Sequence, residues 1–192
     1  MIKFIEYKSG VRLVMEKLDN VRSVSIGIWC NTGSSNELER DFGVSHFIEH
    51  MLFKGTDKRS AFDIVNEIDR IGGQQNAFTS KERTCFFVKA LDEHFDIAAD
   101  DLTDMVCNPA FDENEMEREK LVVCEEIKMN ADDSDDVAID NLERIIYKGT
   151  PMAHPVFGSS ESVMSFTRGS IKEYYRKHYT KDNIVVSVAG SF

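Results

Sequence analysis

The chain has no long hydrophobic run, only three prolines, and no surplus of positive charge. Its 192 residues carry 34 acidic and 23 basic side chains, so the formal net charge is −11. A surface that binds nucleic acid or an anionic membrane needs a surplus of lysine and arginine, so the composition argues against both kinds of partner. No apolar run approaches the ~20 residues that cross a bilayer. The N-terminal segment 1–10 also lacks the apolar centre of a secretory signal, and we therefore expect a cytoplasmic protein.

Cysteine is also scarce, and the four cysteines lie far apart in apolar stretches: Cys30, Cys85, Cys107 and Cys124. No two of them have the short spacing of a zinc ribbon, and the chain is too long and too poor in cysteine for a disulfide scaffold. We therefore predict four buried free thiols in a reducing compartment.

Hydrophobic periodicity predicts a chain in which strands and helices alternate in blocks. Alternating apolar residues predict strands at 2–7, 11–15, 24–29, 74–79, 83–90 and 183–189. Apolar residues at helical spacing, with polar caps and glycine or proline stops, predict helices at 41–53, 60–71, 92–106, 112–130 and 167–175, and a further helix that ends at Tyr147. We expect an α/β fold of the two-layer α+β kind, with helices on a mixed sheet and one domain in the whole chain.

The most specific motif is His46-Phe47-Ile48-Glu49-His50, within the first predicted helix. Residues four apart on a helix project from the same face, so His46 and His50 can bind one metal ion. Zinc suits two imidazoles and a carboxylate, and a catalytic zinc site keeps one position open for water. Glu49 would lie beside the ion without binding it and could accept a proton from that water.

A third ligand has to come from another element, and the long predicted helix at 112–130 offers several glutamates. Glu119 and Glu126 are seven residues apart, which is about two helical turns, so they share one face of that helix. From spacing alone the choice stays open among Glu115, Glu117, Glu119, Glu125 and Glu126.

The motif resembles the inverted zinc motif, HxxEH, of the pitrilysin/insulinase (M16) metallopeptidases, and the similarity continues through residues 51–56. Segment 117–127 is similar to the second motif of that family, in which a glutamate about 76 residues after the second histidine completes the zinc site. The resemblance implies Glu126 as the third ligand, with Glu125 as the fallback. It also implies that Glu119 assists the site without binding the ion.

Two further segments agree with this resemblance. Segment 72–80 resembles the edge strand that pairs with substrate in the family, which implies that Asn76 and Ala77 contact an extended peptide. Segment 179–192 resembles the strand near the end of the family's first domain. The resemblance implies a largely antiparallel mixed sheet with helices on one face. It also implies that residues 1–192 are a single N-terminal zinc-binding domain, completed by a homologous C-terminal domain or a partner subunit.

The implied function is a zinc-dependent endopeptidase with one Zn²⁺ per domain and a peptide as substrate. His46, His50 and Glu126 would hold the zinc, and Glu49 would act as general base. We expect the chain alone to cleave peptides poorly, because the groups that hold the substrate from the second domain are missing. The alternative is a non-catalytic subunit of the same fold that has a structural or peptide-binding role. Such a subunit is expected to break the zinc motif, and this motif is unbroken.

Overall fold

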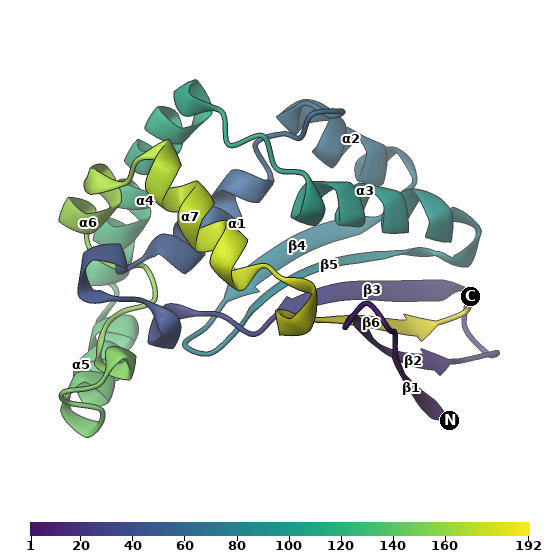
Figure 1. Ribbon diagram of the computed structural model, residues 1–192, viewed down its shortest axis with the longest axis horizontal. Coiled ribbons are helices and arrows are strands. Elements are labelled where there is room, and N and C mark those ends of the chain that lie inside the picture. The colour runs from purple at the N-terminus through teal and green to yellow at the C-terminus, as the bar shows by residue number, and fades with distance from the viewer.

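One six-stranded sheet and seven helices, most of which lie over one face of the sheet, form the protein in the computed structural model, which describes residues 1–192 (Figure 1). The strand order is β1-β2-β6-β3-β5-β4, and every neighbouring pair is antiparallel except β2 and β6. This confirms the predicted two-layer fold with its mixed, largely antiparallel sheet. The strands are β1 (Ile2–Glu6), β2 (Arg12–Lys17), β3 (Ser23–Cys30), β4 (Gln74–Thr79), β5 (Thr84–Leu91) and β6 (Ile184–Gly190).

Five of the seven helices begin where a capping side chain accepts hydrogen bonds from free backbone N–H groups. Ser60 and Asp63 form a reciprocal capping box at the start of α2, and Asp112 accepts hydrogen bonds from two backbone N–H groups of α4. The helices are α1 (Val44–Leu52), α2 (Ala61–Arg70), α3 (Phe95–Cys107), α4 (Glu113–Asp132), α5 (Ser134–Ile146), α6 (Ser160–Ser165) and α7 (Arg168–His178).

The predicted helix bounds differ from the structure by up to three residues, and one helix was missed. The helix expected from residue 41 begins at Val44, because Gly43 adopts a left-handed φ of 90° and a separate 3₁₀ turn precedes it. The short helix α6 was not predicted, since only Val163 among its six residues is buried and the segment shows no apolar period.

The core lies between the helices and the face of the sheet that they cover. Alternate residues of β3 point into it, among them Ile26 and Ile28, and Phe47 and Ile48 of α1 belong to the same core. Each fully buried side chain of this kind contributes roughly 1.5–3 kcal/mol. The central helix α1 is therefore anchored on several sides, which positions the residues of its motif.

The cysteine prediction is correct except at one position. All four thiols are free and three are buried, but Cys107 at the end of α3 is exposed. Burial raises the pKa of Cys85 to about 12, so that thiol remains protonated and unreactive. No helix of the chain is both long enough and apolar enough to cross a membrane.

Candidate metal centre

The start of α1 is held by a buried carboxylate. Glu37 accepts hydrogen bonds from the backbone N–H groups of Gly43 at 2.7 Å and Ser45 at 2.8 Å. Gly43 also allows close contact with the loop before α6, because a Cβ atom there would lie 2.5 Å from the carbonyl oxygen of Phe157. These contacts fix the helix start beside His46, whose side chain is buried.

The side chains of His46, His50 and Glu126 meet where α1 lies against α4. The two histidine Nε2 atoms are 3.2 Å apart. Glu126 Oε2 lies 3.3 Å from the Nε2 atom of His50 and 3.7 Å from that of His46. Tetrahedral zinc with bonds of 2.0–2.1 Å separates its ligand atoms by about 3.3–3.4 Å. The three donor atoms therefore fit around one zinc ion.

The chemistry of this donor group also favours a cation. His50 Nδ1 lies 2.8 Å from Glu119 Oε1 and donates its proton there, so that in the neutral imidazole a lone pair on Nε2 faces His46 and Glu126. Glu126 Oε2 is buried and accepts no hydrogen bond. Buried acceptors that face one another are costly without a shared positive partner, and a metal ion would supply that partner.

The two histidines have opposite electrostatic environments. Burial, aided by the charge of His50, lowers the pKa of His46 to about 3, so His46 is neutral and able to bind a metal. Burial lowers the pKa of His50 too, but the hydrogen bond to Glu119 and the charges of Glu126, Glu119 and Glu49 outweigh it and raise that pKa. The carboxylates around His50 thus favour positive charge at this place.

Glu119 is buried and connects His50 to a lysine that the sequence analysis missed. Lys54 Nζ lies 2.7 Å from Glu119 Oε2, on the opposite side of the carboxylate from His50. Burial raises the pKa of Glu119, but the hydrogen bonds from His50 and Lys54 outweigh it and lower the pKa overall. Glu119 remains ionised and can fix the orientation of the His50 ring. The only signal for Lys54 was its position four residues after His50.

Glu49 projects from α1 toward the edge strand β4. Its Oε2 atom accepts a hydrogen bond of 2.5 Å from Thr79 Oγ1, a second contact that the sequence analysis missed. Burial raises the pKa of Glu49, although the hydrogen bond from Thr79 and the charge of His50 act against it. A carboxylate with a raised pKa, close to His50 and Glu126 but outside the donor group, suits a general base.

The other predicted site residues lie at two different places. Glu125 is exposed and pairs with Lys128 at 2.7 Å, so the fallback ligand points away from the histidines. Asn76 and Ala77 lie on β4, which pairs with β5 on one side only and leaves its other edge free. The backbone N–H group of Ala77 donates to the Asn76 side chain at 2.8 Å and not to strand β5.

A hollow of about 310 Å³ adjoins the donor group. It lies between Thr79, the turn after β4, and the exposed helix α5, and three carboxylates line it: Asp136, Asp140 and Glu143. Lys81 is the one basic residue of the lining, and it is paired with Glu143 at 2.8 Å. Phe157 closes the other side, with its ring centre 4.7 Å from that of His46.

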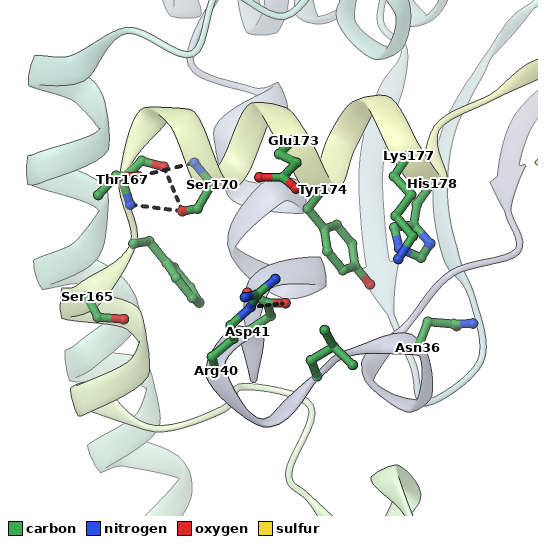
Figure 2. A pocket seen from close by; sticks show the side chains of 12 residues that line it. Asn36, Arg40, Asp41, Ser165, Thr167, Ser170, Glu173, Tyr174, Lys177 and His178 are labelled. Carbon is green, nitrogen blue, oxygen red and sulfur yellow. Dashed lines mark hydrogen bonds and ion pairs between the residues drawn. The ribbon is translucent and has the colours of Figure 1, made fainter.

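A second hollow, of about 360 Å³, lies between α7 and residues 36–41 (Figure 2). Its lining mixes opposite charges, such as Arg40 with Asp41 and Glu173 with Lys177. None of the three metal donors lines either hollow, but Thr79 and Phe157, which contact Glu49 and His46, line only the first. The Tyr174 hydroxyl of the second hollow lies 3.0 Å from Ser45 Oγ and joins α7 to the motif helix. The donor group therefore lies at the α1–α4 contact and apart from this hollow.

Comparison with known proteins gives a consistent set of relatives. The family model described as "Insulinase (Peptidase family M16)" matches residues 12–160. A Bacillus subtilis protein named as an uncharacterized zinc protease is 49% identical over 191 residues, covering 100% of this chain and 47% of the relative. A probable mitochondrial-processing peptidase subunit beta of Arabidopsis thaliana is 34% identical over 183 residues, covering 95% of this chain and 34% of the relative.

Solved structures show the same fold. A protease from Helicobacter pylori superposes with a TM-score of 0.93 at 25% identity, covering 100% of this chain and 47% of that one. An inactive M16 peptidase domain from Pseudomonas fluorescens gives 0.92 at 18% identity, with the same coverage, and at that identity it indicates the fold alone. The chain spans about half the length, or less, of the curated relatives it matches.

Proposed function

The chain belongs to the insulinase family, peptidase family M16, and we propose that it is the zinc-binding domain of an endopeptidase that hydrolyses extended peptides. The observation that carries the proposal is the meeting of His46, His50 and Glu126, since the glutamate lies 76 positions after the second histidine in the sequence. Their spacing suits zinc, and relatives named as zinc proteases support the choice of metal.

In this proposal each nearby side chain has a separate role. His46, His50 and Glu126 would hold the ion, and Glu119 would fix the His50 ring through its Nδ1–H group. Bound zinc supplies a Lewis acid that polarises the scissile carbonyl and acidifies a water molecule. Glu49 would take the proton from the attacking water and pass it to the leaving amine.

Substrate would bind along the free edge of β4, where main-chain hydrogen bonds recognise extended peptides of many sequences. The Ala77 N–H group would exchange its present acceptor, the Asn76 side chain, for a carbonyl oxygen of the peptide. Asp136 and Asp140, the two carboxylates of the nearby hollow that are not paired with Lys81, favour a basic side chain in the peptide. A lysine-containing peptide is therefore expected to have a lower KM than its glutamate counterpart, by up to about fivefold for a partly screened charge pair.

We further propose that residues 1–192 work with a second, homologous domain or partner subunit and that the protein acts in the cytoplasm. The relatives' greater length supports the first of these two proposals. The non-catalytic alternative is not favoured, because it predicts an incomplete donor group, whereas His46, His50 and Glu126 lie together.

Zinc binding tests the metal assignment with a matched pair of variants. Glu126→Gln is expected to lower zinc affinity on the order of 100-fold or more, because it removes a charged ligand. Glu125→Gln changes the same residue type one position earlier, on the exposed face, and should leave the affinity unchanged. Equal losses in both variants, measured by competition with a chelating dye, would refute Glu126 as a ligand.

Peptide cleavage tests the chemistry. In the protein with both halves present, Glu49→Gln should retain zinc and lower kcat on the order of 10²–10⁴-fold. The chain alone should cleave a fluorogenic peptide poorly and gain activity when the second half is added. Full cleavage by Glu49→Gln would exclude this mechanism.

A further inference from the structure

Strand β4 contacts the proposed base directly, in addition to offering its free edge to a peptide. Because side chains alternate along a strand, Gln75, Ala77 and Thr79 face the helices while Asn76 and Phe78 face the other way. Thr79 is the last residue of β4, and its hydroxyl reaches Glu49 on α1. Thr79 is thus the contact through which the strand can fix the Glu49 side chain.

The direction of this hydrogen bond follows from the neighbouring threonine. Thr84 Oγ1 lies 3.0 Å from the carbonyl oxygen of Thr32 and donates its only proton there. The Thr79 proton then has two possible acceptors, Glu49 Oε2 at 2.5 Å and Thr84 Oγ1 at 3.4 Å. The short distance and the carboxylate acceptor favour Glu49, because a hydrogen bond to a charged oxygen is shorter and stronger than one to a hydroxyl.

Glu49 has no other hydrogen-bond or ion-pair partner in the chain. The ion pairs of the site belong to Glu119 and Glu126, and none includes Glu49. Its carboxylate is largely buried, and a single hydroxyl donor fixes one of its two oxygen atoms. The orientation of this carboxylate therefore depends on one side chain, Thr79.

We propose that Thr79 is a positioning residue that holds the Glu49 carboxylate in its orientation for proton transfer, and so couples the substrate-binding strand to the base. This inference rests on the proposed peptidase function. Asn76 and Ala77, three and two residues before Thr79, are the proposed peptide contacts on the same strand. A peptide that pairs with β4 would therefore order the strand that orients the base.

Three threonine variants in the protein with both halves present test the role. Thr79→Val keeps the side-chain shape and removes the donor, and it is expected to lower kcat about 10–100-fold, because a misplaced general base loses most of its contribution. KM and zinc affinity should each stay within about threefold, since neither depends on this hydrogen bond. Thr79→Ser keeps the hydroxyl and should restore kcat to within about fivefold. Thr103→Val makes the same change at an exposed position of α3 and is the control.

Crystal structures of the zinc-loaded variants supply a readout that does not use activity. The Glu49 carboxylate should turn away from its wild-type position in Thr79→Val and keep that position in Thr79→Ser. An unchanged kcat in Thr79→Val, an equal loss in Thr79→Ser, or loss of zinc from Thr79→Val would each overturn the positioning role. Failure of the wild-type protein to cleave peptides with zinc bound would overturn the proposed function itself, and the inference with it.

Discussion

Helices α1 and α5 lie in opposite environments. Helix α1 buries seven of its nine residues, including the polar side chains of Ser45 and His46. Helix α5 buries none of its thirteen residues and exposes four large apolar side chains: Ile139, Leu142, Ile145 and Ile146. In Figure 1, α1 lies among the other helices above the sheet, whereas α5 extends away at one end.

The difference distinguishes a firmly packed helix, which positions the proposed site, from an exposed helix beside it. The proposed ligands His46 and His50 project from the firmly packed α1, as does the proposed base Glu49, whereas Glu126 projects from α4. A buried scaffold holds such groups to within fractions of an ångström. Helix α5 lines the hollow beside them and is held mainly by polar contacts, such as Lys81 with Glu143 and Asn130 with Asp136. A segment with few buried contacts opens at lower free-energy cost than a buried one, and α5 is such a segment.

The largest expected effect is the difference in stability loss between isoleucine-to-alanine substitutions in the two helices. Ile48→Ala removes a fully buried side chain from α1 and should lower the free energy of unfolding by about 2–5 kcal/mol. Ile145→Ala in α5, where the side chain is 73% exposed, should change it by less than about 0.5 kcal/mol. Urea denaturation measures both, and equal losses would show that α5 is packed in solution.

Zinc binding should increase the difference in local stability, because it should stabilise α1 and α4 but not α5. At a free zinc concentration of 100 times Kd, zinc binding should raise the free energy of unfolding by about 2.7 kcal/mol. Amide hydrogen exchange should therefore slow in α1 and α4, which carry the donor group, and stay nearly unchanged in α5. EDTA should reverse the effect. Comparable slowing throughout α5 would contradict the separation of the two regions.

The buried Glu37 at the start of α1 should make stability depend on pH. Burial raises its pKa to about 7 from 4.5, although hydrogen bonds from Ser45 and Gly43 act against it. Because the pKa is raised in the folded state, its contribution is fully present below about pH 4.5 and is lost as pH rises through 7. From pH 5 to 8 the wild type should lose about 1–3 kcal/mol relative to Glu37→Gln.

Thermal denaturation across that pH range measures this effect, and Glu39→Gln is the control because Glu39 is exposed. A pH profile of Glu37→Gln parallel to that of the wild type would show that Glu37 stays ionised on folding.

The smallest effect is expected on the exposed face of α5. Ile146→Lys places a charge where the side chain is 62% exposed and should change the free energy of unfolding by less than about 0.5 kcal/mol. Sedimentation should show equal or reduced self-association, because the exposed apolar area falls. A loss above about 1.5 kcal/mol would mean that this face packs against the domain.

Short-range patterns predicted most of the fold. The caps at Ser60 and Asp112 and the alternation in the strands depend on residues within a few positions of one another, so they can be read from the sequence. The short helix α6 and the exposure of Cys107 were not predicted, because the apolar residues nearby in the sequence do not show which other segments pack against them.

The sequence by itself determined the motif helix, with His46, Glu49 and His50 one turn apart or adjacent, because helical geometry follows from local spacing. The resemblance added Glu126, but only the contact between α1 and α4 decided that Glu126 faces the histidines while Glu125 faces solvent. The contacts of Lys54 with Glu119 and of Thr79 with Glu49 were likewise decided by tertiary structure. The physical reason is that both join residues 30 or more positions apart, which meet only when the helices pack on the sheet.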